Sequence, residues 1–471
     1  MQDYFTIDTI KKILRPEEIL SGNFGLEKEG LRITSDGKLA LTPHPEIFGK
    51  KLENPYITTD FSESQVEIVT PTFHSIDEAY HYLSFIVDIV NTNISDDEYI
   101  WNSSIPCIIP SSDKIPLAKY SDNIDGEKAR TYRKNLAAKY GTKKQLISGI
   151  HYNFSFTEET IKKLHEKYPK NIDYKEFKNQ LYLKIVRNYL RYKWLIIYLT
   201  GASVGAHETF TTECTTLMNK KDEKNSFYST EGPSFRNASC GYKNLIQLYP
   251  RYDSLNNYIS DVNSFIDKGL LSEAKELYTQ IRLKPKDRDN VLKSLKQDGI
   301  LYIEIRTVDI NPFDKCGITK LDMKFIHLFI IYLLITKETK YEKWQEDSVI
   351  NEELTAQLGY KTDTKLIKDG KEITIKEWAT EILDNMKKMN NDLQLNSEDI
   401  LNKIQEKIEN PSKTYGKELA KIIKYNGFID SQISIAKHNK ETSFNIIDFD
   451  YIKNDEKLYE FYTKSLPNKK I

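Results

Sequence analysis

Acidic side chains recur at alternate positions in one short stretch near the start of this chain. In residues 25–33 (GLEKEGLRI), Glu27 and Glu29 are two residues apart. Neighbouring side chains of a β-strand point to opposite faces, so both carboxylates would lie on one face, about 7 Å apart. Such anions repel each other, and a hard divalent cation such as Mg²⁺ would remove the repulsion. Taken alone, the stretch is more typical of an exposed strand with solvated acids.

Three further stretches predict strands with a polar face: residues 57–71 (ITTDFSESQVEIVTP), 148–156 (SGIHYNFSF) and 299–309 (GILYIEIRTVD). Glu67 lies on the polar side of the first, and His151 lies on the polar side of the second. Glu304 and Arg306 share one face of the third. A lone histidine is often structural, and an exposed Glu–Arg pair contributes little to stability, so each stretch alone carries a weak signal.

A sheet that gathered these groups on one face would concentrate negative charge beside one guanidinium. Several Mg²⁺ ions held by carboxylates, with an arginine for the transferring oxygens, serve nucleotide-dependent phosphoryl transfer. The chain has no GxxxxGK[ST] loop and no GxGxxG turn, which are the defining motifs of P-loop, kinase and Rossmann folds. The sequence therefore does not support any of these three folds. A metallohydrolase would need more histidine ligands than His151, and a non-catalytic binding protein would not need Arg306.

Helical spacing predicts the elements that hold these strands, over residues 75–95, 172–200 and, irregularly, 254–298. Residues 325–335 (FIHLFIIYLLI) form an apolar run that is too short to cross a bilayer, which takes about 20 residues, and reads as a buried helix. We expect an α+β fold in which residues 1–335 form the catalytic core. Residues 336–471 are rich in Lys, Glu and Asn and predict a mainly helical C-terminal region packed on that core.

Composition limits the partners of this chain. The 68 Lys and Arg residues nearly balance 69 Asp and Glu, giving a net charge of −1. The charge therefore predicts no bulk attraction to nucleic acid or to a membrane surface, and we expect a monomer. The N-terminus has acids and no apolar signal-peptide core, so we expect a cytoplasmic protein. The four cysteines are far apart without CxxC pairs, which predicts reduced thiols instead of a disulfide framework or zinc site.

Several strings of the chain closely resemble one known family. They are GLEKEGLRI, ITTDFSESQVEIVTP, YRKNLAAKYG, ISGIHYNFSF, IVRNYLRYKWLIIYLTGAS and GILYIEIRTVDINPF. In this order they resemble the bacterial type of glutamate-cysteine ligase, also called γ-glutamylcysteine synthetase. The resemblance runs from about residue 15 to 335 and weakens across 203–230. It implies a core similar to glutamine synthetase, with a curved antiparallel sheet that forms a funnel surrounded by helices.

The resemblance also implies roles for individual residues. The positions that match those holding or bordering the Mg²⁺ cluster are Glu27, Glu29, Asp60, Glu67, His151 and Glu304. Arg306 matches the arginine that faces the ATP γ-phosphate, and with Glu304 it forms the expected catalytic pair. The positions that match substrate contacts are Arg236, for the glutamate carboxylate, Phe61, Tyr132, Tyr242 and Tyr278, for the cysteine side chain, and Ile147.

The implied reaction joins the γ-carboxylate of L-glutamate to the amine of L-cysteine, with ATP converted to ADP and phosphate. It would pass through γ-glutamyl phosphate, need Mg²⁺ or Mn²⁺, and be the first step of glutathione biosynthesis. Such a ligase needs no protein nucleophile, so the lack of a Ser-His-Asp or Cys-His pattern is consistent. The open alternative is a related carboxylate-amine ligase with another amine acceptor, because fold and phosphoryl chemistry do not fix the acceptor.

Overall fold

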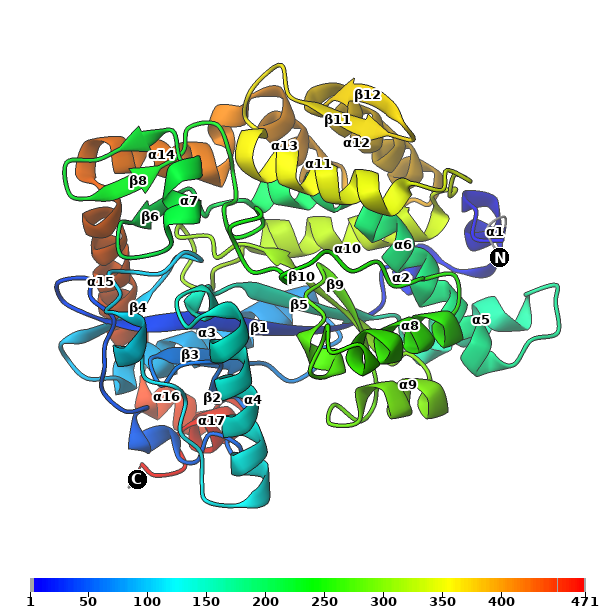
Figure 1. Ribbon diagram of the computed structural model, residues 1–471. Coiled ribbons are helices and arrows are strands. Elements are labelled where there is room, and N and C mark those ends of the chain that lie inside the picture. Colours follow the sequence, from blue (N-terminus) through cyan, green and yellow to red (C-terminus); the bar gives the residue numbers. More distant parts are fainter. Residues whose placement is uncertain (1–3, 447, 470–471) are drawn as a thin grey trace.

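An antiparallel β-sheet forms the centre of the computed structural model, which describes residues 4–446 and 448–469 (Figure 1). Its strands lie in the order β2 (Ile57–Thr59), β3 (Gln65–Val69), β1 (Asn23–Thr34), β5 (Ile150–Ser155), β10 (Tyr302–Val308) and β9 (Ile281–Lys284). β4 (Glu98–Trp101) pairs with the end of β1. The strands expected in residues 148–156 and 299–309 are therefore present as β5 and β10.

One face of this sheet is apolar and covered by long helices. Tyr152 and Phe154 of β5 and Ile303 and Ile305 of β10 are at most 1% exposed. They share a single hydrophobic core with α3 (Ile76–Asn93), α6 (Tyr174–Thr200) and α10 (Lys320–Ile335). Because side chains alternate along a strand, burying these residues directs their polar neighbours to the opposite face.

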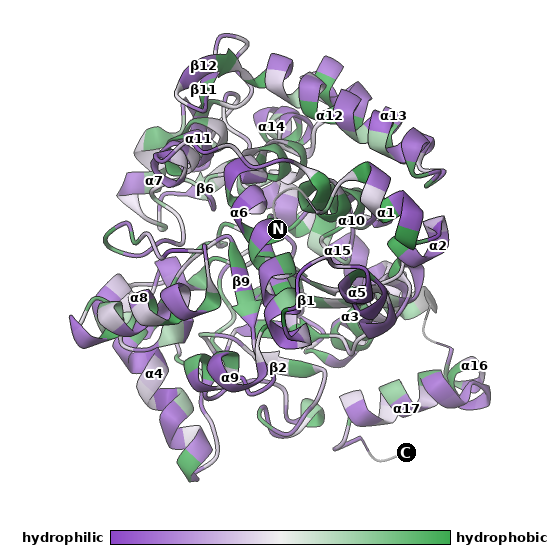
Figure 2. Ribbon diagram, turned by 90° about the vertical axis from the view of Figure 1, so that its right-hand side faces the viewer, coloured by the Kyte–Doolittle hydropathy of each residue, from purple (hydrophilic) through white to green (hydrophobic). Residues whose placement is uncertain are grey.

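The helices begin where the sequence supplies capping side chains. Ser75, Asp173 and Thr319 accept hydrogen bonds from backbone N–H groups in the first turns of α3, α6 and α10. Hydropathy separates the buried α10, which is mainly hydrophobic, from α4 (Ile124–Tyr140), which is mainly hydrophilic (Figure 2). The buried helix expected at residues 325–335 is confirmed as the C-terminal part of α10.

The region after residue 335 is mainly helical and lies against the core. Its elements are α11 (Trp344–Leu358), β11 (Lys365–Lys368), β12 (Lys371–Thr374), α12 (Ile375–Asp392), α13 (Glu398–Glu409), α14 (Tyr415–Asn426), α15 (Phe428–Ile446), α16 (Phe449–Asn454) and α17 (Glu456–Ser465). In Figure 1, α11 lies over α6, while α15 returns to β4 and α17 packs against α3. The rings of Tyr82 and Phe461 stack at 4.4 Å where α17 meets α3.

Further short α-helices and strands lie elsewhere in the described chain. They are α1 (Ile7–Ile13), α2 (Pro16–Ile19), α5 (Glu158–Glu166), β6 (Gly205–His207), α7 (Thr212–Leu217), β7 (Lys220–Lys221), β8 (Ser226–Tyr228), α8 (Leu255–Asp267) and α9 (Val291–Asp298). Strands β6, β8 and β7 form a separate three-stranded sheet. The described residues contain no helix that combines the length and apolar character needed to cross a membrane.

The fold class expected from the sequence, α+β with a large antiparallel sheet and many helices, is confirmed. The irregular helical prediction for residues 254–298 is confirmed at α8 and α9 and is wrong for residues 281–284, which form strand β9. Ile281 and Leu283 are buried while Arg282 and Lys284 alternate with them, and this four-residue pattern pairs with β10. It is too short to stand out against the helical spacing on both sides.

The cysteine prediction is also wrong for one pair. Cys214 of α7 and Cys240 form a disulfide across 26 residues of sequence, whereas Cys107 and Cys316 are buried free thiols. The pairing depends on how the segment of β6–β8 folds back against the turn at residues 236–242, and sequence spacing alone does not reveal that approach.

Candidate active site

A cavity of about 510 Å³ opens over the polar face of the central sheet. Every site residue expected from the sequence lines it: Glu27, Glu29, Asp60, Phe61, Glu67, Tyr132, Ile147, His151, Arg236, Tyr242, Tyr278, Glu304 and Arg306. These residues come from strands, turns and a helix that are spread along the chain from residue 27 to residue 306. The fold therefore brings the whole predicted set into one space.

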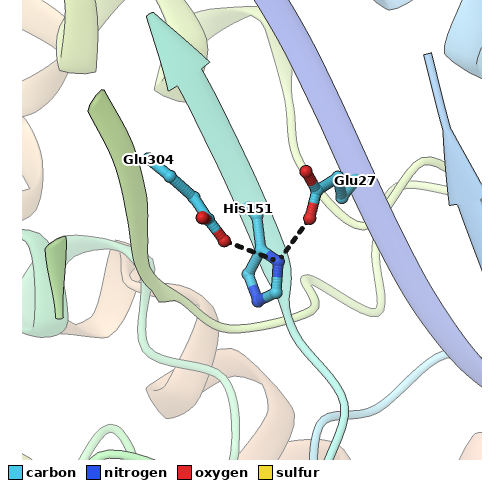
Figure 3. A group of neighbouring side chains, drawn as sticks. All are labelled: Glu27, His151 and Glu304. Carbon is cyan, nitrogen blue, oxygen red and sulfur yellow. Dashed lines mark hydrogen bonds and ion pairs between the residues drawn. The ribbon is translucent and has the colours of Figure 1, made fainter. Parts of the chain in front are cut away.

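Three adjacent strands bring together a compact group of ligand atoms (Figure 3), and the three residues that carry them line this cavity. Glu27 of β1 lies directly across from His151 of β5, and Glu304 of β10 projects from the next strand. His151 Nδ1 lies 2.8 Å from Glu27 Oε2 and 3.4 Å from Glu304 Oε1. One ligand atom from each residue falls within 4.8 Å of the others, a spacing that suits one metal ion. The donor set of two carboxylates and one imidazole fits a divalent cation.

Neighbouring cations hold part of this group in its charged form. Burial raises the pKa of Glu27, but the hydrogen bond with His151 and the charge of Lys284 outweigh it and lower that pKa to about 2. Burial opposes ionisation of Glu304 too, yet Lys284 and Arg306 lower its pKa well below the usual range. Burial and the charge of Arg306 lower the pKa of His151, so its imidazole is neutral and available as a ligand.

A second group of acids lies beside this one with less compensation. Glu29 of β1 is directly across from Glu67 of β3, and Asp60 lies in the turn before β3. Burial and the nearby Asp60 raise the pKa of Glu29 to about 8 and that of Glu67 well above its usual range. A divalent cation bound here would favour the ionised carboxylates. The residues present therefore fit a metal-binding region larger than one three-residue group.

Arg306 lines the same cavity and contacts two residues of the three-residue group. Its Nη1 donates to Glu304 Oε1 at 2.5 Å and lies 3.4 Å from His151 Nδ1. Lys284 Nζ lies 2.6 Å from the other oxygen of Glu304. Glu304 thus fixes two cations whose remaining donors can face an anionic ligand, as a phosphoryl group would require.

Cationic residues that the sequence reasoning missed line the same cavity. Arg282, Lys284 and Arg288 surround the end near β9 and β10. Lys284 and Arg288 each lie 6.0 Å from the centre of the Tyr302 ring. The signal was the string IRLKP, in which Arg282 and Lys284 alternate with apolar residues before a proline, as an edge strand does.

Two further residues that the sequence reasoning missed, Arg133 and Gln145, also line the cavity. Arg133 of α4 donates from Nε to the backbone oxygen of Asp60 at 2.5 Å, and its guanidinium lies 4.7 Å from the centre of the Tyr120 ring. Gln145 accepts a hydrogen bond from Tyr242 Oη at 3.3 Å. Neither Arg133 nor Gln145 has a spacing that marks it, because one lies on a helix and the other in a short turn.

Aromatic residues close the part of the cavity near Arg236. The rings of Tyr242 and Tyr278 lie 4.2 Å apart, and Phe61 is buried at 2% exposure. The Arg236 guanidinium rests on Gly149, where an added Cβ would lie 2.2 Å from Nη2. The side of the cavity beyond the acids therefore combines one guanidinium with an aromatic wall.

Comparison with known proteins identifies the family of this chain. The family model described as glutamate-cysteine ligase matches residues 7–270 and 265–356, more than half of the chain. The chain belongs to the glutamate-cysteine ligase family. The expected family is thus confirmed.

Curated relatives of this glutamate-cysteine ligase family member include proteins of two lengths. The bifunctional glutathione biosynthesis protein of Clostridium perfringens is 39% identical over 93% of this chain and 58% of its own length. The glutamate-cysteine ligase of Clostridium acetobutylicum is 34% identical over 79% of this chain and 85% of its own length. The chain therefore spans little more than half the length of the bifunctional relatives it matches.

A solved structure supports the same family and fold. The crystal structure of glutamate-cysteine ligase from Francisella tularensis in complex with AMP matches with a TM-score of 0.85 and 26% sequence identity. The match covers 96% of this chain and 95% of that one. The agreement over nearly the whole chain includes the region after residue 335, where the resemblance noted in the sequence ends.

Proposed function

We propose that this chain catalyses the ATP-dependent joining of the γ-carboxylate of L-glutamate to the amine of L-cysteine, which begins glutathione biosynthesis. One observation carries the proposal: the acid cluster, Arg306 and the aromatic wall share one cavity of about 510 Å³. Phosphoryl transfer and the amide-forming step must occur on one bound glutamate, so their machinery has to be contiguous.

A metal ion belongs to this proposal. Glu27, His151 and Glu304 would hold Mg²⁺, with Mn²⁺ as a substitute, and Glu29, Asp60 and Glu67 would border or complete the set. When bound, the ion neutralises charge on the nucleotide phosphates. Arg306 would direct its guanidinium at the γ-phosphoryl oxygens, where negative charge grows in the transition state.

The nucleotide would occupy the end of the cavity near β9 and β10. Arg282, Lys284 and Arg288 place three cations there, which suits a triphosphate. The glutamate γ-carboxylate oxygen would attack the γ-phosphorus, and ADP would leave. The neutral cysteine amine would then attack the acyl carbon of γ-glutamyl phosphate, inorganic phosphate would leave, and the amine would lose one proton.

The amino acids would occupy the other end. Arg236 offers a fork of donors for a carboxylate of glutamate, and Ile147 would contact the same substrate. Phe61, Tyr132, Tyr242 and Tyr278 would form the surface for the acceptor side chain, where a small polarisable sulfur fits an aromatic wall. A ligase for another amine acceptor is the second candidate, because the aromatic wall selects the size and polarity of the acceptor side chain more than its chemical identity.

The proposal extends to the organisation of the protein. Residues 1–335 would carry the metal, ATP and amino-acid sites, and residues 336–471 would support them as a mainly helical region. The chain would act as a cytoplasmic monomer on small-molecule substrates, without nucleic acid or membrane.

Release of ADP by the purified protein tests the reaction. The protein would be supplied with ATP, Mg²⁺, L-glutamate and one acceptor, chosen from L-cysteine, L-2-aminobutyrate, L-serine, L-alanine and glycine. We expect L-cysteine to have the highest kcat/KM and L-2-aminobutyrate, which is nearly isosteric, to remain usable. A higher kcat/KM for an acceptor whose side chain differs in size from that of L-cysteine would favour a ligase for another amine acceptor.

A variant pair tests the metal site. Glu27→Gln should lower turnover by orders of magnitude at any Mg²⁺ concentration while the protein stays folded. Glu98→Gln is the matched control, because Glu98 is a buried carboxylate of the same sheet that pairs with Arg32 away from the cavity. The control should lower stability but not turnover per folded molecule. Full activity of Glu27→Gln, or of the wild type in excess chelator, would contradict the metal assignment.

A further inference from the structure

The segment that carries Arg236 lacks regular secondary structure of its own. Arg236 lies between β8 and α8, in a stretch of turns, and its side chain is 9% exposed. Burial lowers the pKa of its guanidinium, and the negative charge of the nearby Asp309 opposes that shift. Its position must therefore be set by contacts with other segments.

Asp309 supplies such contacts from behind the cavity. It follows β10, is fully buried, and does not line the cavity. Its Oδ2 accepts hydrogen bonds from the backbone N–H groups of Ala202 and Ser203, both at 3.0 Å, and from the Ser203 hydroxyl at 2.6 Å. One carboxylate oxygen thus holds the turn that follows α6.

The same carboxylate also holds the Arg236 segment. Asp309 Oδ1 lies 4.0 Å from Arg236 Nη1 and accepts a hydrogen bond from Asn237 Nδ2 at 3.4 Å. The Ser203 hydroxyl oxygen accepts from the backbone N–H of Arg236 at 3.1 Å, and the Ser203 carbonyl oxygen accepts from the backbone N–H of Phe235 at 3.0 Å. Asp309 and Ser203 together therefore tie the turn after α6 to the residues on both sides of Arg236.

We propose that Asp309 is a positioning residue for Arg236, so that it sets the affinity for the carboxylate of the amino-acid substrate without touching that substrate. The inference rests on the proposed function, because it assumes that Arg236 binds glutamate. Asp309 lies three residues after Arg306, directly after the end of β10, so the same segment of chain would present the phosphoryl-facing arginine and anchor the substrate-facing one.

The donors around Asp309 explain why a carboxylate is needed. Three donors converge on Oδ2, and two more groups, the Arg236 guanidinium and the Asn237 amide, face Oδ1. Asparagine has an amide NH₂ in place of one oxygen, so one of these two sets would meet a donor instead of an acceptor. Asp309→Asn would also remove a buried anion whose Oδ1 lies 4.0 Å from Arg236 Nη1.

Asp309→Asn provides the test, with Asp88→Asn as its matched control. Asp88 is 1% exposed, and both of its oxygens lie 2.7 Å from Lys315 Nζ behind the sheet, away from Arg236. We expect Asp309→Asn to raise KM for L-glutamate about tenfold or more, with kcat changed by less than about threefold and KM for ATP unchanged. Asp88→Asn should leave all three constants unchanged.

Two further measurements keep the outcomes distinct. Calorimetric binding of L-glutamate to the wild type tests the proposed function, since a wild type that does not bind glutamate refutes that function. Equal glutamate affinity of the wild type and Asp309→Asn would overturn the inference alone. If Asp309→Asn does not fold, Ser203→Ala replaces it, because that change removes only the hydroxyl between Asp309 and the Arg236 backbone. It should raise KM for glutamate, and an unchanged KM would overturn the inference.

A double variant shows whether the effect passes through Arg236. With Arg236→Lys already present, adding Asp309→Asn should raise KM for glutamate much less than it does in the wild type. Equal effects in both backgrounds would mean that Asp309 acts independently of Arg236, and would overturn the inference.

Discussion

Gly149→Ala is the perturbation whose effect the structure specifies most directly. Gly149 does not have positive φ, so alanine is compatible with its backbone. The new Cβ would, however, lie 2.2 Å from Nη2, 2.5 Å from Cζ and 2.7 Å from Nε of Arg236. Because the whole guanidinium plane rests on this position, rotating one terminal nitrogen cannot relieve the contact.

The size of the displacement follows from these distances. Ordinary van der Waals contact begins at 3.4 Å, so Nη2 must withdraw by the difference from 2.2 Å, which is 1.2 Å. A misplacement of about 1 Å in a substrate-positioning group can lower the rate on the order of 100-fold. We therefore expect kcat/KM for glutamate to fall about 100-fold, equivalent to about 2.7 kcal/mol of transition-state stabilisation. Since the Gly149 N–H bond to Glu29 is retained, the acid cluster should be unaffected.

Initial-rate assays at varied glutamate, together with thermal unfolding, would measure this effect. Gly25→Ala is the control, because its Cβ would lie 3.6 Å from the nearest atom, Asn153 Cβ, in the same sheet. It should keep the wild-type kcat/KM. Wild-type kinetics in a folded Gly149→Ala protein would refute the idea that the Arg236 guanidinium is held in place by the bare backbone of Gly149.

Three further outcomes can be measured on single variants. Arg306→Lys should lower kcat more than KM for glutamate, because one ammonium cannot replace a planar multi-donor group; a change in KM alone would move Arg306 to substrate binding. Tyr242→Ala should raise KM for cysteine with little change for glutamate or ATP, and an unchanged preference among acceptors would exclude Tyr242 from their pocket. Burial lowers the pKa of His327 from about 6.5 to about 3, so the unfolded chain binds the extra proton below pH 6.5 and stability falls as the solution is acidified. Acidification from pH 7.5 to pH 5 should lower the free energy of unfolding, measured with urea, by about 2 kcal/mol through this group. The His327→Leu variant should lose less stability over the same pH range.

Local alternation was enough to predict the acid cluster. Glu27, His151 and Glu304 each stand on a strand whose apolar partners alternate with them, so the face of each side chain could be read from its neighbours. Neither this alternation nor the family resemblance gave the order of the strands, and the adjacency of β1, β5 and β10 comes from the structure. The register that puts Glu27 across from His151 then follows from hydrogen bonding between the strands.

Features that depend on long-range approach were missed. Strand β9 is short and lies between helices, so Arg282 and Lys284 gave only four residues of alternation. The Cys214–Cys240 disulfide and the contact between Asp309 and Arg236 join segments separated by 26 and 73 residues. No periodic pattern marks such contacts, because they arise when turns meet in three dimensions.

The order of strands in the central sheet has a consequence for how this protein acquires its site. Strand β1 begins at residue 23, yet it lies between β3 and β5, and β10, which ends at residue 308, pairs with β5. A growing chain therefore cannot complete the Glu27, His151 and Glu304 group until residue 304 has been synthesised. Pairing between such distant segments is slow, because the entropy cost of closing the loop is incurred before the stabilising contacts form. Ligands that bind the finished site then stabilise the entire sheet by mass action, so protection of β1 amides from hydrogen exchange should rise with ligand concentration although β1 is synthesised first.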